Sequence, residues 1–311
     1  MKIIFMGTPD FAVPILERIA CCHEVVLVVT QPDTYSPRKR RFLPSPVKEF
    51  ALVKGLALLQ PESIKKEAEA IMSRPCDLIV TAAYGQFVPK RLLEFPKYGA
   101  INVHGSLLPK YRGGAPIQRA LMNGEEKTGI SIIYMTPKMD AGDILMQREI
   151  AISEADDADS LFRKLSLLGS EMILEAIEGL EKGTITPVKQ DESLVTFAPN
   201  LTKEDEILDF KKPAREVLNR IRGLASNPGA YFLFEGVQIK VYAGRVSPEG
   251  TDAKPGRIVS VKKDAFGISC GAGTVLEITE VQVPGKKRMS VRDFLNGSGR
   301  DLISIDKEID L

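Results

Sequence analysis

Tryptophan is absent from this chain of 311 residues, and histidine occurs only twice, as His23 and His104. The four cysteines show no Cys-x-x-Cys spacing, which argues against a disulfide framework and against a zinc site. We therefore expect small buried thiols of a reducing compartment and no bound metal. The chain also lacks any apolar run near the roughly 18 residues that a membrane-spanning helix needs, so we expect no membrane partner.

An excess of either charge is missing as well. Lys and Arg number 42 and Asp and Glu number 41, which gives a formal net charge of +1. This balance argues against a protein that coats nucleic acid with its whole surface, but it leaves room for local basic patches. The chain opens on the apolar stretch 2–6, without the charged and apolar regions of a secretion signal. We expect a soluble monomer in the cytoplasm.

The first 180 residues alternate short apolar runs with helical patterns. The pattern predicts strands over 2–6, 24–30, 57–59, 77–81, 99–104, 129–135 and 144–152. It predicts helices over 11–20, 45–54, 61–73, 113–123 and 157–182, with a proline-rich loop over 31–46. The run EVVLVVT at 24–30 does not alternate, which is typical of a strand covered on both faces. The predicted fold class is therefore α/β, with a Rossmann-like, mostly parallel sheet.

The composition changes near Thr184, where a polar stretch without a sustained period begins. After one more predicted helix over 212–223, short strands are expected at 231–234, 238–243, 256–261, 267–270 and 274–283. Glycine and proline separate these strands at the spacing of a small barrel. We predict a catalytic domain over 1–186, a linker over 187–205 and a small C-terminal β-barrel domain over 206–311.

One of the two histidines lies in the most informative segment, Ile-Asn-Val-His-Gly-Ser-Leu-Leu-Pro at 101–109. Asn102 and His104 share one face of the predicted strand, because side chains alternate along a strand. They lie near its carboxyl end, where ligands bind in open parallel sheets. Asp140 follows in the acidic turn 138–143. An amide, an imidazole and a carboxylate are a suitable set for stabilising an oxyanion and moving a proton.

Long stretches of the chain match one known family. The matching stretches are MGTPDFAVP (6–14), QPD (31–33), SPVK (45–48), AAYGQ (82–86), GAINVHGSLLPKYRGGAPIQ (99–118), MDAGD (139–143), TFAPNLTKED (196–205), SNPGAY (226–231) and PGKKRMS (284–290). On these residues the chain resembles the methionyl-tRNA formyltransferases over essentially its whole length. The resemblance implies a Rossmann-like formyltransferase domain and an oligonucleotide-binding-type (OB-like) barrel that helps to hold tRNA.

The resemblance also implies an activity and a set of residues. A formyl group would pass from 10-formyltetrahydrofolate to the α-amine of methionyl initiator tRNA, for translation initiation. Asn102, His104 and Asp140 would be catalytic, with Asp140 either holding the imidazole or relaying a proton. The resemblance assigns folate binding to Ser106, Leu107, Leu108 and Pro109. The two basic clusters expected to contact tRNA are Arg38, Lys39, Arg40 and Arg41 in the proline-rich loop, and Lys286, Lys287 and Arg288 in the C-terminal domain.

One departure from the family concerns that loop, because Tyr35-Ser36-Pro37-Arg38 stands where family members carry Pro-x-Gly-Arg. Proline cannot adopt the left-handed conformations open to glycine, so the loop path is expected to differ. Two other functions stay open at this point. The same catalytic set would suit a formyltransferase for a small-molecule amine such as a nucleotide sugar. A protein that binds folate or tRNA without turnover is a further alternative.

Overall fold

The computed structural model describes residues 1–36 and 39–310, and the chain forms two compact units. The first unit comprises residues 1–116, 127–151 and 162–199, and the second comprises 117–126, 152–161 and the chain from 200 onward. The stretch 187–205, which we predicted to be a linker, is therefore divided between the units. Its residues up to Pro199 belong to the first unit.

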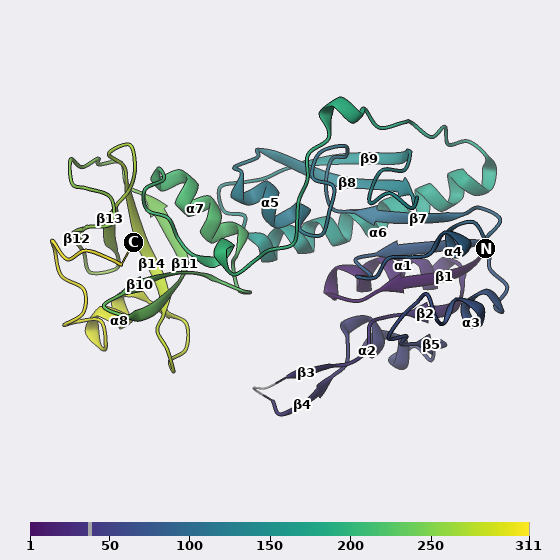
Figure 1. Ribbon diagram of the computed structural model, residues 1–311, viewed down its shortest axis with the longest axis horizontal. Helices are drawn as coiled ribbons and strands as arrows, with labels where there is room; N and C mark the ends of the chain where they lie inside the picture. Colours follow the sequence, from purple (N-terminus) through teal and green to yellow (C-terminus); the bar gives the residue numbers. More distant parts are fainter. Residues whose placement is uncertain (37–38, 311) are drawn as a thin grey trace. The chain divides into compact units, whose positions relative to one another are not determined.

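A seven-stranded sheet forms the centre of the first unit (Figure 1). Its strand order is β5 (Leu58–Leu59), β2 (Glu24–Val29), β1 (Lys2–Gly7), β6 (Leu78–Ala82), β7 (Ala100–His104), β8 (Lys127–Tyr134) and β9 (Ile144–Ala151). The five strands from β5 to β7 pair in parallel, whereas β8 is antiparallel to both of its neighbours. The carboxyl ends of β1, β6 and β7 therefore share one edge of the sheet, as the predicted Rossmann-like arrangement requires.

Helices cover both faces of this sheet. On one face, α3 (Ala68–Met72) and α4 (Lys90–Leu93) pack against Ile4 and Met6 of β1. On the other face, α6 (Ala158–Lys182) approaches β7 so closely that a Cβ on Gly169 would lie 3.0 Å from Val103 Cγ1. The same glycine faces Ile15 of α1 (Val13–Cys22). This two-sided burial explains why the strand sequences are continuously apolar. Among the residues that the structure describes, no helix is both long and apolar enough to cross a membrane.

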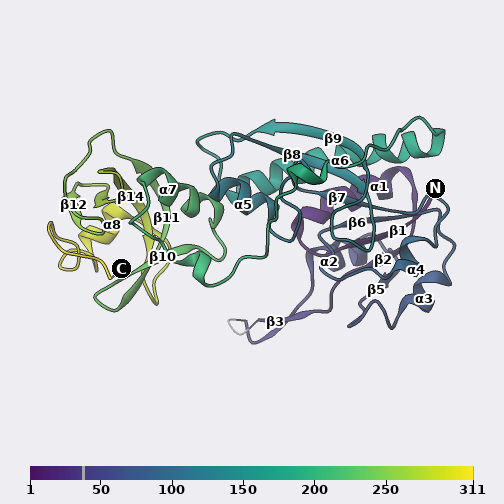
Figure 2. The same ribbon diagram turned by 45° about the horizontal axis from the view of Figure 1, so that its top comes forward.

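Two predictions for the first unit were wrong in part. The helix expected over 61–73 is confined to α3, because the Gln86 side chain binds the backbone that would have begun it. Gln86 Oε1 accepts from the Ile64 N–H at 2.9 Å, and Nε2 donates to the Pro61 carbonyl at 3.1 Å. The loop expected over 31–46 contains an antiparallel hairpin of β3 (Thr34–Ser36) and β4 (Arg41–Leu43), which leads to α2 (Pro46–Val53). Figures 1 and 2 both show this hairpin extending away from the parallel sheet.

The second unit contains a six-stranded antiparallel sheet. Its order is β10 (Ala230–Phe234), β11 (Val237–Val246), β14 (Val275–Gln282), β13 (Phe266–Ser269) and β12 (Ile258–Val261), with β15 (Met289–Ser290) on β14. The helices α7 (Ala214–Gly223) and α8 (Val291–Asn296) contribute to its core, whose aromatic members are Phe210, Phe232, Phe234, Phe266 and Phe294. These results confirm the predicted α/β sheet followed by a small antiparallel β domain.

The sheet of the second unit is closed by the C-terminal segment, which the sequence patterns did not predict. Glu308 pairs with Arg257 next to β12, and Asp310 pairs with Leu233 of β10. The Asp310 N–H donates to the Leu233 carbonyl at 3.0 Å, and the Ile309 N–H donates to the Gly256 carbonyl at 2.9 Å. Because one short segment bonds to both edge strands, neither edge is left fully open, which gives the barrel-like closure expected of an OB-like fold.

Candidate active site

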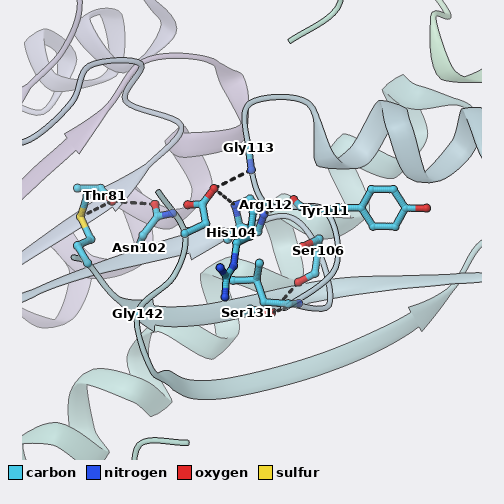
Figure 3. Close-up of polar contacts among 12 residues, drawn as sticks. Thr81, Asn102, His104, Ser106, Tyr111, Arg112, Gly113, Ser131 and Gly142 are labelled. Atoms are coloured by element: carbon cyan, nitrogen blue, oxygen red, sulfur yellow. Dashed lines mark hydrogen bonds and ion pairs between the residues drawn. The ribbon is translucent and has the colours of Figure 1, made fainter. Parts of the chain in front are cut away.

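Asn102 lies on β7 at the carboxyl edge of the parallel sheet, beside Thr81 of β6. The Thr81 hydroxyl donates a hydrogen bond to Asn102 Oδ1 at 2.7 Å (Figure 3). With Oδ1 bonded to Thr81, the Nδ2 donor end of the amide points away from Thr81. Asn102 is half-buried, so its amide is held in a fixed direction at the edge where a ligand is expected.

His104 ends β7 and is 5% exposed. Its Nε2 lies 2.9 Å from the Tyr111 carbonyl oxygen. A carbonyl can only accept, so Nε2 carries a proton and donates it to Tyr111. This bond leaves Nδ1 as the ring nitrogen that faces the carboxylate of Asp140.

Asp140 reaches this site from the turn between β8 and β9. Its Oδ2 lies 3.7 Å from His104 Nδ1 and accepts a hydrogen bond from the Gly113 N–H at 2.9 Å (Figure 3). The side chain is 14% exposed, and the backbone of Asp140 is left-handed, with φ at 49°. The structure therefore brings Asn102, His104 and Asp140 to one edge of the sheet, although Asp140 is remote from the other two in the sequence.

The Nδ1 atom of His104 and the carboxylate of Asp140 form an unusual pair. In a neutral imidazole whose Nε2 carries the proton, Nδ1 can only accept, and an ionised carboxylate can only accept as well. Two acceptors that face each other repel, unless a proton or a donor lies between them. The pair is thus suited to binding one proton, or one N–H or O–H group of a bound molecule.

Two side chains that sequence reasoning missed, Ser131 and Gln147, form hydrogen bonds with the backbone of the predicted folate-binding turn 106–109. Ser131 Oγ donates to the Ser106 carbonyl at 2.6 Å and accepts from the Leu108 N–H at 3.1 Å. Gln147 Nε2 donates to the Leu108 carbonyl at 2.9 Å. Ser106 and Leu108 are themselves buried, whereas Leu107 and Pro109 keep part of their surface exposed. Ser131 lies opposite His104 in β8, and only the strand register reveals this relationship.

The basic residues of the hairpin are exposed where the structure describes them. Lys39, Arg40 and Arg41 are all exposed, whereas the predicted residue Arg38 lies outside the described residues. The hairpin also exposes two aromatic rings, Tyr35 at 51% and Phe42 at 66%, which meet edge to face with centroids 5.5 Å apart. An exposed aromatic pair among cations is typical of a surface that binds single-stranded nucleic acid.

A polar network fixes the base of this hairpin. Lys48 Nζ lies 2.8 Å from both carboxylate oxygens of Asp33, and Gln60 Nε2 donates to the same carboxylate at 2.8 Å. The hydrogen bonds from Gln60 and Lys48 lower the pKa of Asp33. Gln31, next in the network, donates through Nε2 to the Tyr84 carbonyl at 3.1 Å. The hairpin is therefore anchored to the loop that follows β6.

The second basic cluster is less uniform than the sequence suggests. Lys286 and Lys287 are exposed. Arg288 instead forms two hydrogen bonds of 2.6 Å with the Glu280 carboxylate, and its guanidinium lies 4.6 Å from the centre of the Tyr242 ring. The charge of Arg288 is thus already paired within the second unit. The described residues contain no group of three or more His, Cys, Asp or Glu placed to hold a metal ion.

Comparison with known proteins agrees with this geometry. The formyl transferase family model matches residues 1–177, and the model for the formyl transferase C-terminal domain matches residues 200–299. The methionyl-tRNA formyltransferase of Bacillus licheniformis is 48% identical over 301 residues, covering 96% of this chain and 95% of that protein. The methionyl-tRNA formyltransferase of Bacillus subtilis is 45% identical over 313 residues, covering 99% of both chains.

Solved structures share the fold at much lower identity. The sugar 3N-formyl transferase WlaRD, determined in the presence of dTDP and 5-N-formyl-THF, superposes with a TM-score of 0.67 at 18% identity, covering 92% of this chain and 99% of that chain. The N-formyltransferase of Helicobacter canadensis, in complex with folinic acid and dTDP-3-aminofucose, gives a TM-score of 0.69 at 18% identity, covering 89% of this chain and 98% of that chain.

Proposed function

This chain belongs to the formyl transferase family, and we propose that Asn102, His104 and Asp140 are the side chains with which it moves the formyl group. It is a one-carbon group transferase that formylates methionyl initiator tRNA. The donor that we propose is 10-formyltetrahydrofolate. The observation that carries the assignment of these residues is the convergence of Asp140 on His104 Nδ1 at 3.7 Å, beside the amide of Asn102.

The reaction begins when the neutral α-amine of the methionyl group attacks the formyl carbon. A free α-amine has a pKa of about 7.7, so a useful fraction is neutral at physiological pH. Attack forms a new C–N bond and places a negative charge on the formyl oxygen. Asn102 Nδ2 is the donor directed at this oxygen, and a preorganised donor of this kind contributes about 10²–10³ in rate.

The attacking amine must lose a proton, and the leaving nitrogen of the folate must gain one. The space between His104 Nδ1 and Asp140 suits this transfer because it is lined by two acceptors. A proton from the amine binds there and is then delivered to N10 as the C–N10 bond breaks. The Tyr111 carbonyl keeps His104 protonated at Nε2, which directs Nδ1 toward the reaction.

The two substrates would bind on either side of these groups. Leu107 and Pro109, the partly exposed members of the turn, supply apolar contact for the flat pterin of the folate. Lys39, Arg40 and Arg41 contact phosphates of the tRNA, and such contacts position the tRNA without reading its sequence. Tyr35 and Phe42 stack on unpaired bases near its acceptor end. We also propose that Lys286 and Lys287 contact tRNA, whereas Arg288 supports its own unit.

The test is a single-turnover experiment with labelled formyl donor and methionylated initiator tRNA. We expect transfer to the tRNA, with strong competition by uncharged initiator tRNA and none by nucleotide sugars carrying an amino group. Competition by the sugars instead would favour a small-molecule acceptor. Binding of both substrates without any turnover would contradict an enzymatic role. The cytoplasmic location, the monomeric state and the lack of a metal requirement stay predictions.

A further inference from the structure

We propose that Gln190 is a positioning residue, which fixes the turn of Asp140 and is itself held by the buried guanidinium of Arg112. The inference rests on the role of Asp140 in the proposed function. It concerns a residue from the stretch that the sequence indicated to be a linker, and it explains how a surface turn can present a carboxylate in a fixed direction.

The turn that carries Asp140 needs outside support. Its backbone is left-handed at Asp140, which costs about 1–2 kcal/mol for an ordinary residue. Within the turn, the bond from the Ala141 N–H to the Lys138 carbonyl is long, at 3.4 Å. Gln190 Nε2 donates to the carbonyls of both Asp140 and Gly142, each at 2.8 Å. One side chain thus bonds to the backbone of two turn residues, including the one that carries the carboxylate.

The orientation of the Gln190 amide follows from its other partner. Gln190 Oε1 accepts hydrogen bonds from Arg112 Nε at 3.0 Å and from Arg112 Nη2 at 2.8 Å. A guanidinium can only donate, so Oε1 must face Arg112 and Nε2 must face the carbonyls. Arg112 therefore determines which end of the amide points at the Asp140 turn.

Arg112 and Gly113 contact two different parts of the Asp140 turn, one indirectly and one directly. The Gly113 N–H bonds to the carboxylate, while Arg112 acts through Gln190 on the backbone. The backbone of Arg112 is held by two further hydrogen bonds. Its N–H donates to the Thr196 carbonyl at 2.9 Å, and its carbonyl accepts from the Ala198 N–H at 2.7 Å. These consecutive residues thus connect the carboxylate, the turn and the segment 190–198.

The burial of Arg112 is difficult to explain by stability alone. It is 1% exposed, its Nη1 has no hydrogen-bond partner among the described residues, and its one carboxylate partner, Glu192, is 59% exposed at the side chain. A buried cation with an unsatisfied donor is costly, and replacing such groups by apolar ones is often neutral or stabilising. Its two bonds to Gln190 Oε1 give this guanidinium a positioning role instead.

The test replaces Gln190 with glutamate. Q190E keeps an acceptor for Arg112, so the buried cation stays paired, but it removes the donor to the two carbonyls. We expect kcat to fall about 10²-fold, as for a displacement of about 1 Å. KM for each substrate should stay within about threefold of its original value, and the melting temperature should be nearly unchanged. The matched control E192Q neutralises a carboxylate that pairs with Arg112 and with the side chain of Lys138 in the turn. It leaves the bonds from Gln190 Nε2 to the turn backbone in place, and should change kcat less than twofold.

A double-mutant cycle then separates positioning from a general structural role. In the D140N background we expect Q190E to lower the single-turnover rate less than twofold, because there is no carboxylate left to position. An equal loss in both backgrounds would overturn the proposal, and so would a Q190E enzyme that keeps its activity or fails to fold. A fully active D140N enzyme would contradict the proposed role of Asp140. If D140N is slow but Q190E keeps its rate, only the positioning role of Gln190 is contradicted.

Discussion

Replacing Asp140 with asparagine tests the proposed chemistry most directly. Asparagine has nearly the same volume and tolerates the left-handed backbone better than most residues, so the φ of 49° can be kept. Its Oδ1 can still accept from the Gly113 N–H, which now lies 2.9 Å from the carboxylate. The substitution therefore removes the charge and the strong proton acceptor while leaving the turn in place.

The expected loss follows from the role of the carboxylate. General acid–base catalysis contributes about 10²–10⁴ in rate, which corresponds to ~2.7–5.4 kcal/mol at about 1.36 kcal/mol for each factor of ten. Alanine would be a poorer choice. It would leave the Gly113 N–H without its acceptor at a cost of about 1–3 kcal/mol, and it would add about 1–2 kcal/mol for the left-handed backbone. A slow D140A enzyme could therefore reflect a displaced turn.

The assay is rapid-quench, single-turnover transfer of labelled formyl to methionylated tRNA, with both substrates saturating. Circular dichroism checks that the melting temperature of D140N is unchanged. We expect a rate reduced by at least 10²-fold with both substrates still bound. A folded D140N enzyme whose rate lies within tenfold of the original would refute the assignment of Asp140 to proton transfer.

Three further predictions address the hairpin and the second unit. Replacing Arg40 and Arg41 with alanine should weaken tRNA binding and reduce its salt dependence by about one unit of slope for each lost phosphate contact, and an unchanged slope would remove these cations from the interface. Because the chain contains no tryptophan, Tyr35→Trp introduces a single tryptophan, whose emission should change when tRNA is added. A tryptophan placed instead at Tyr98, which lies beside a lysine on the amino-end side of the sheet, should not respond. Glu277 is 3% exposed, and the hydrogen bond from its lysine partner lowers its pKa. E277Q should therefore lower the melting temperature at neutral pH, and the difference in melting temperature between the two proteins should shrink as the pH falls below about 4.3 and the original carboxyl becomes protonated. A difference independent of pH would contradict the ion-pair explanation.

The turn 106–109, to which the resemblance assigns folate binding, shows where sequence reasoning ends. The sequence could not indicate that Ser106 and Leu108 are buried while Leu107 and Pro109 keep exposed surface. That division depends on Ser131 and Gln147, which reach the turn from β8 and β9 through strand pairing.

The hairpin and the second basic cluster show the same limit for charged residues. A run of cations in the sequence predicts a basic surface, and Lys39, Arg40 and Arg41 are indeed exposed. Arg288 appears equivalent in sequence, but it bonds to Glu280 on the neighbouring strand. Whether a cation is available to a ligand depends on its neighbours in space, which a count of charges does not contain.

The sequence alone determined the alternation of strands and helices, because burial on both faces requires continuous apolar runs and helices require their own period. It also determined the face shared by Asn102 and His104, since side chains two residues apart on a strand point the same way. Only the tertiary structure decided that Asp140 meets His104, that Gln190 bonds both to Arg112 and to the turn of Asp140, and that the C-terminal segment closes the second sheet. Those contacts join residues far apart in the chain, so they depend on how packed elements place them, and no local pattern of residues encodes that placement.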